Sequence, residues 1–198
     1  MGDRNDLGGN TVRLILLGGP GAGKSTQAKR LSQTLNIPWI STGDELRAEI
    51  VAHTQLGEQV KPAIEQGELV KDETMIGLIR QWLQTTDAAS GWLLDGYPRT
   101  AFQAEELNFL LDELGQTLDW AIWLEAPEDI LRERSQARSR LDDQPEAVQR
   151  RIKLLYERTV PILDYYDYRQ KLLSVDGNQT PERVEQDIKA ALQTKRSI

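Results

Sequence analysis

The segment at residues 18–25, GGPGAGKS, constrains the fold of this chain more than any other. Its spacing matches the pattern G-x-x-x-x-G-K-[ST], which follows a strand and opens a helix. Residues 12–17 before it are an apolar run of strand length. In such a turn the glycines let backbone N–H groups point at an anion, and the helix N-terminus adds partial positive charge. The motif therefore predicts a phosphate-binding turn between a strand and a helix.

Three side chains extend this prediction to a nucleotide and its metal. Lys24 supplies a mobile full charge for the β- and γ-phosphates, and the hydroxyl of Ser25 could ligate Mg²⁺. Asp95 closes the apolar run WLLD, where a carboxylate would hold Mg²⁺ directly or through water. The alternative for Asp95 is a turn-forming residue before Gly96. Because the same chain carries a phosphate loop, we favour the metal role.

Apolar runs of strand length alternate with helical patterns along the chain. The runs lie at residues 12–17, 37–40, 92–94, 118–124 and 172–175. Nearly continuous apolar strands separated by helices indicate a parallel sheet that is covered on both faces. We therefore expect an α/β fold of the P-loop NTPase type, with a doubly wound sheet of five parallel strands. In such sheets, ligands bind beyond the carboxyl ends of the strands.

The chain length of 198 residues and the absence of a Pro/Gly-rich linker predict a single domain over residues 12–198. Residues 1–11 are expected to form a flexible leader. Two insertions interrupt the alternation of strands and helices. Residues 41–70 carry two short helical patterns, and residues 134–144 are polar and rich in arginine.

Several helix starts are readable. The segments 42–45 and 100–103 each match a capping box, with Thr at the N-cap and Glu or Gln three residues later. The segment 143–146 favours a helix start capped by Asp143. Asp142 and Asp143 could also orient the neighbouring arginines.

Composition excludes several classes of function. The chain has 24 Lys and Arg against 31 Asp and Glu, a net charge of −7, which argues against nucleic acid and anionic membranes as partners. No apolar run approaches the roughly 18 residues of a membrane span, and the first residues lack a signal peptide's apolar stretch, so we expect a cytoplasmic protein. With no Cys and one His, disulfides, thiolate catalysis and a zinc site are not expected.

Two further segments place an arginine just past a strand end: STGDELR at residues 41–47 and DGYPRT at residues 95–100. Together with the phosphate loop and the sequence R-x-D-D at residues 140–143, they resemble the adenylate kinase family in content and order. The resemblance covers the chain from about Val12 to the last helical pattern. It implies the reaction ATP + AMP ⇌ 2 ADP with Mg²⁺, in a monomer. The short polar segment at 134–144 resembles the short-lid form, without a zinc-holding lid.

The resemblance also implies the site residues. Residues 41–70 would form the AMP-binding segment. The ATP-binding set would be Gly19, Pro20, Gly21, Ala22, Gly23, Lys24, Ser25, Thr26 and Arg134. The AMP-binding set would be Thr42, Gly43, Arg47, Glu68, Leu69, Val70, Gly96, Arg99, Gln103, Arg140 and Arg151. Catalysis would rest on Lys24, Arg99, Arg134, Arg140 and Arg151, and Mg²⁺ on Asp95 and Ser25.

Two alternatives remain at this stage. The uridylate/cytidylate kinase branch is similar, but it usually has Ala where Thr42 stands and Asn where Thr100 stands. Gln103 suits adenine, because an amide can pair with a donor and an acceptor on one edge of the base, although it could simply cap a helix. A non-catalytic adenine-nucleotide sensor is the other alternative, and the many cations argue against it. Ile130 stands where the family usually has Arg, which leaves the preference for ATP or GTP open.

Overall fold

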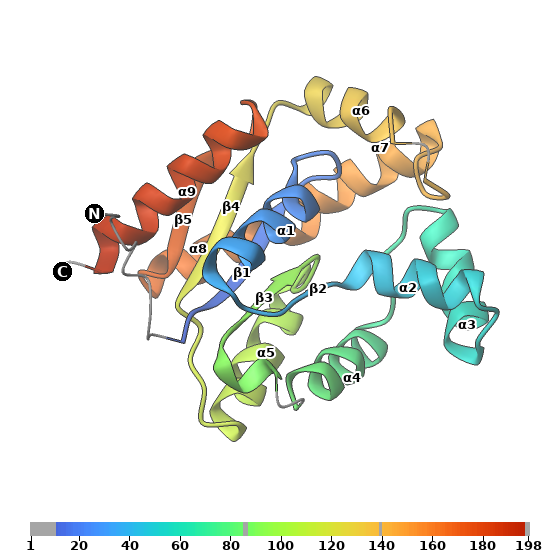
Figure 1. The fold of residues 1–198 in the computed structure, drawn as a ribbon. Coiled ribbons are helices and arrows are strands. Elements are labelled where there is room, and N and C mark those ends of the chain that lie inside the picture. The colour runs from blue at the N-terminus through green and yellow to red at the C-terminus, as the bar shows by residue number, and fades with distance from the viewer. Residues whose placement is uncertain (1–10, 85–86, 139, 197–198) are drawn as a thin grey trace.

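The computed structural model describes residues 11–84, 87–138 and 140–196. A sheet of five strands forms its centre, in the order β2-β3-β1-β4-β5 (Figure 1). The strands are β1 (Arg13–Gly18), β2 (Trp39–Ser41), β3 (Trp92–Asp95), β4 (Trp120–Glu125) and β5 (Leu172–Asp176). Every neighbouring pair is parallel, which confirms the predicted fold class. Of the expected leader at residues 1–11, residues 1–10 lie outside the described residues.

Helices cover both faces of the sheet. One face packs against α1 (Lys24–Leu35), α6 (Glu128–Gln136), α7 (Pro145–Leu154) and α9 (Pro181–Arg196). The other packs against α4 (Asp72–Leu83), α5 (Ala101–Glu113) and α8 (Pro161–Tyr168), and the core on this side continues into α2 (Thr42–Val51) and α3 (Gln55–Glu65). A 3₁₀ turn, Asp87–Ser90, precedes β3, and one turn of π-helix, Leu155–Thr159, joins α7 to α8.

The strand β1 shows why its sequence is apolar without alternation. Successive side chains of a strand point to opposite faces of the sheet. Leu14 and Leu16 belong to the core under α1 and α9, whereas Ile15 and Leu17 belong to the core under α4 and α5. Because both faces are covered, the four buried positions of the strand, residues 14–17, are all apolar.

Helices α2 and α3 extend from the sheet beside β2 and face the segment that joins α6 to α7 (Figure 1). The connection after α3 lies against α7. A Cβ atom added to Gly67 would come within 2.3 Å of the carbonyl oxygen of Ala147, so only glycine fits there. Next to it, Arg150 and Glu68 form an ion pair of 2.6 Å. These contacts attach the first insertion to α7, the helix that follows the second insertion.

Two of the predicted helix starts need correction. Thr100 caps α5 as expected, with its hydroxyl accepting from the N–H of Gln103. Helix α2, however, is capped by Ser41 rather than Thr42. Helix α7 begins after Gln144, without a side-chain cap, so the prediction that Asp143 caps it is wrong. Thr42 instead donates to the carbonyl oxygen of Asp95, which is distant in sequence, and Asp143 instead binds Arg138 and the backbone N–H of Arg140.

Candidate active site

The phosphate loop connects β1 to α1 at the carboxyl end of the sheet. Gly21 has a φ of +80°, and a Cβ atom there would lie 2.6 Å from the carbonyl oxygen of Leu131. Gly23, the residue before α1, has a φ of +95°. Lys24 folds back over the loop and donates to the carbonyl oxygens of Gly18 and Gly19, at 2.8 and 2.7 Å. The loop thus has the backbone that the sequence motif predicts.

A cavity of about 330 Å³ opens beside this loop, on the side of α6 and α9; we call it the donor-side cavity. From the predicted ATP-binding set it is lined by Gly21, Ala22, Gly23, Lys24, Ser25, Thr26 and Arg134. Gly19 and Pro20 do not line it. Its remaining wall includes Gln179, Pro181 and Val184, which the sequence analysis did not single out. They follow β5, so their place at the carboxyl end of a strand was the signal available for them.

Arginines from the last turn of α6 and from the α6–α7 connection line the donor-side cavity. Arg134 donates to the carbonyl oxygen of Gly177 at 2.8 Å. Arg138 and Arg140 also line this cavity. Arg140 was expected in the AMP-binding set, yet it does not line the pocket described below, and it pairs at 3.4 Å with Asp44. It therefore lies between the two sides of the site.

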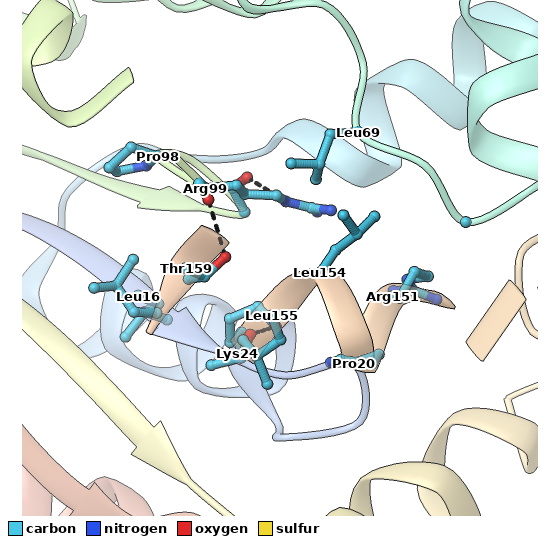
Figure 2. A pocket seen from close by; sticks show the side chains of 14 residues that line it. Leu16, Pro20, Lys24, Leu69, Pro98, Arg99, Arg151, Leu154, Leu155 and Thr159 are labelled. Carbon is cyan, nitrogen blue, oxygen red and sulfur yellow. Dashed lines mark hydrogen bonds between the residues drawn. The ribbon is translucent and has the colours of Figure 1, made fainter. Parts of the chain in front are cut away.

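A second, small cavity of about 40 Å³ lies at the centre of the site (Figure 2). Lys24, Arg99 and Arg151 line it, and they come from α1, the turn after β3, and α7. Arg99 is held by its own turn, because its Nε donates to the carbonyl oxygen of Gly96 at 2.8 Å. Thr159 donates to the carbonyl oxygen of Arg99 at 3.0 Å. Three basic side chains from distant parts of the chain thus line the same small cavity.

A third pocket, of about 50 Å³, lies toward α2 and α3; we call it the acceptor-side pocket. From the predicted AMP-binding set it is lined by Thr42, Gly43, Arg47, Glu68, Leu69, Val70, Gly96, Arg99, Gln103 and Arg151. Its apolar wall also includes Leu46, Ile64 and Met75. Nothing in the sequence separated these three from core residues, because their helical spacing is the same. The pocket therefore combines guanidinium groups with apolar side chains, which suits an anionic ligand that also has an apolar part.

Burial of these cations lowers their affinity for protons. The pKa of Lys24 falls from 10.5 to about 7, mainly because its ammonium group is removed from water, and Arg99 and Arg151 add to the effect while Asp95 opposes it. The pKa of Arg151 falls to about 10 for the same main reason. An anion that binds among cations held together in this way is attracted by each of them and stabilises their charged forms. The site is thus suited to a polyphosphate.

Two buried carboxylates, Asp142 and Asp143, face these arginines. Asp142 pairs with Arg151 at 2.8 Å and with Arg47 at 3.5 Å. Asp143 pairs with Arg138 at 2.9 Å, and its other oxygen accepts from the backbone N–H of Arg140. Of the two roles considered for these residues, orientation of arginines is therefore the correct one.

Ser25 and Asp95 lie together beneath the loop, with 2.5 Å between Oγ and Oδ2. Among the residues that the structure describes, no three or more His, Asp or Glu side chains form a group that could enclose a metal. Mg²⁺ prefers oxygen ligands, and with nucleotides it commonly takes only one or two from the protein. A hydroxyl beside a carboxylate at a phosphate loop fits such a partial site.

The family model described as "Adenylate kinase" matches residues 16–171. The chain belongs to the adenylate kinase family. Similar curated members are "Adenylate kinase 2" of Nostoc sp., 58% identical over 89% of this chain and 96% of the relative, and "Adenylate kinase 2" of Synechocystis sp., 51% identical over 91% and 100%. "Adenylate kinase" of Xylella fastidiosa is 46% identical over 91% and 99%. No helix among the described residues has the length and apolar character to cross a membrane.

Proposed function

We propose that this chain catalyses the reversible, Mg²⁺-dependent transfer of the γ-phosphoryl group of ATP to AMP, which gives two ADP. The observation that carries the proposal is the central cavity, where Lys24, Arg99 and Arg151 meet between the donor-side cavity and the acceptor-side pocket. ATP would occupy the donor side and AMP the acceptor side. The names of the similar curated proteins agree with this reaction.

The chemistry requires no nucleophile from the protein. An oxygen of the AMP phosphate attacks the γ-phosphorus, and the bond from that phosphorus to the bridging oxygen of ADP breaks. Negative charge spreads over the transferring group, so catalysis consists of in-line positioning and neutralisation of charge. Arginine suits this task because its planar guanidinium grips phosphate oxygens through two hydrogen bonds and keeps its charge. We assign Arg99 and Arg151 to the AMP phosphate, and Lys24, Arg134 and Arg140 to the ATP phosphates and the transferring group.

Ser25 and Asp95 would hold Mg²⁺, directly or through water. The ion would neutralise part of the charge on the β- and γ-phosphates and orient them. The short connection from residue 134 to residue 144 would act as a lid that limits the access of water to the γ-phosphate. We further propose that the enzyme works in the cytoplasm and that it works as a monomer, because one chain supplies the phosphate loop, the central arginines and the pockets on both sides of them.

A coupled assay of ADP formation, with ATP as donor and AMP, UMP, CMP or GMP as acceptor, tests the proposal. We expect turnover with AMP to exceed that with each other acceptor by at least tenfold. Faster turnover with UMP or CMP would identify a uridylate/cytidylate kinase. Binding of ATP and AMP without turnover would identify a nucleotide sensor.

A further inference from the structure

The side-chain amide of Gln103 lies in the wall of the acceptor-side pocket and is only 2% exposed. Both of its ends already have a partner. Its Nε2 donates to Oδ1 of Asp72 at 2.7 Å, and its Oε1 accepts from the backbone N–H of Arg99 at 2.8 Å. No role for Asp72 followed from the sequence motifs.

These two partners allow only one orientation of the amide. A carboxylate can only accept hydrogen bonds, and a backbone N–H can only donate one. A flipped amide would set its oxygen against the carboxylate of Asp72 and its NH₂ group against the N–H of Arg99. Both bonds would be lost in a buried place, and the bond to the carboxylate is the stronger of the two because it is charge-assisted.

The fixed amide retains capacity for a ligand. An amide nitrogen carries two hydrogens and an amide oxygen two lone pairs, so one donor and one acceptor remain, in a set order. Adenine presents an amino donor at N6 beside an acceptor at N1. Hypoxanthine has the same ring system with the order reversed, an oxygen acceptor at C6 beside an N1–H donor. The orientation of Gln103 therefore decides which of the two purines it can pair with.

We propose that Asp72 is a positioning residue that sets the selectivity for the acceptor base by fixing the amide of Gln103. Asp72 is the first residue of α4, and one residue, Lys71, separates it from the segment 67–70, which lines the pocket. Its Oδ1 also lies 3.5 Å from the hydroxyl of Thr100, the cap of α5. Asp72 thus joins the starts of the two helices that supply Met75 and Gln103 to the pocket. The proposal rests on the proposed function, in which AMP occupies this pocket.

The test compares two substitutions of similar size, Asp72→Leu and Asp72→Asn, with AMP and IMP as acceptors. Both remove the same negative charge from the first turn of α4, but only Asn retains an acceptor oxygen for Gln103. For Asp72→Leu we expect KM for AMP to rise and the preference for AMP over IMP, measured as the ratio of kcat/KM, to fall roughly tenfold. We expect kcat with saturating AMP to stay within about threefold of wild type, because Asp72 does not touch the reacting groups. Asp72→Asn should keep the preference within about threefold.

An unchanged preference in Asp72→Leu would overturn the proposal, as would an equal loss in Asp72→Asn, which would point to the lost charge instead. If Asp72→Leu does not fold, Asp72→Ala takes its place, since it also lacks an acceptor. Failure of the proposed function has a different signature: wild-type enzyme would then use UMP or CMP better than AMP.

Discussion

The carboxylate of Asp142 holds Arg47 across the cleft, with 3.5 Å between Oδ1 and Nη1, and this contact joins α2 to the segment before α7. The same carboxylate holds Arg151 at 2.8 Å. Two arginines of the acceptor-side pocket are therefore arranged around an anion of the protein itself. A nucleotide phosphate that binds there supplies a second counter-charge for the same guanidinium groups.

The first prediction concerns this carboxylate. Asp142→Asn removes the buried charge that Arg47 and Arg151 share and leaves them only their pairs with Asp44 and Asp143, so we expect the free energy of unfolding without ligand to fall by about 2 kcal/mol. The rise in Tm on adding ADP without Mg²⁺ should exceed that of wild type, because the phosphates replace the lost charge. Thermal unfolding with and without ADP measures both effects. Asp129→Asn, at an exposed position of α6, is the control, and an equal Tm in both variants would contradict the prediction.

The second prediction concerns Arg140, which lies between the two sides of the site. If it acts mainly on the transition state, Arg140→Ala lowers kcat by ~10²–10³, the usual cost of losing a preorganised donor. Steady-state kinetics with ATP and AMP provide the measurement. Arg132→Ala is the matched control, because Arg132 pairs with Glu128 on the surface of α6. A decrease of less than threefold in kcat would remove Arg140 from the transferring group.

Asp95 gives the third prediction. Asp95→Asn keeps the hydrogen bond to Ser25 possible but removes the charge that attracts Mg²⁺. We expect the concentration of Mg²⁺ at half-maximal rate to rise roughly tenfold. A titration of activity with Mg²⁺ at fixed ATP measures it. An unchanged titration curve would show that Asp95 takes no part in holding the metal.

A fourth prediction follows from the contact between α1 and α9. Hydrogen bonds from Lys189 and Arg30 lower the pKa of Glu185 from 4.5 to about 2. A lowered carboxyl pKa stabilises the fold above the pKa of the unfolded chain, and this stability is lost as the pH falls through the folded value. Glu185→Gln should therefore lower the free energy of unfolding by about 1–2 kcal/mol at pH 7, after allowance for solvent screening.

Denaturant unfolding of Glu185→Gln and wild type from pH 7 down to pH 2 tests this. The difference between the two should begin to shrink below about pH 4.5 and vanish near pH 2. Glu182→Gln is the control, since Glu182 pairs with Arg30 but its side chain is 64% exposed. A difference that stays constant over this range would contradict the assignment.

The fifth prediction concerns Tyr166, which is 3% exposed and whose hydroxyl has no hydrogen-bond partner among the residues that the structure describes. A buried polar group without a partner costs free energy, so Tyr166→Phe should raise the free energy of unfolding by about 1 kcal/mol. Tyr168→Phe, on the same helix but 88% exposed, should leave it unchanged. A decrease in Tyr166→Phe would show that the hydroxyl has a partner, such as a bound water.

Much of the fold was predictable because its signals are local. The apolar runs became the five strands, and the cap at Thr100 formed as its spacing predicts. Strand β2 begins two residues later than expected, because the backbone N–H of Ile37 still bonds to the carbonyl oxygen of Ser32 in α1. At Thr42 and Asp143 the local rule failed, since Thr42 instead donates to the carbonyl oxygen of Asp95 and Asp143 pairs with Arg138.

The sequence by itself determined the parallel sheet, the phosphate loop and the identity of most cations, because each depends on a short pattern of residue types. It could not determine how these cations are shared between the two sides of the site. Three contacts join residues from different elements. Arg140 pairs with Asp44, Asp142 pairs with two arginines, and Asp72 accepts a hydrogen bond from Gln103. Such contacts depend on how helices pack at the carboxyl end of the sheet, so only the tertiary structure decides them.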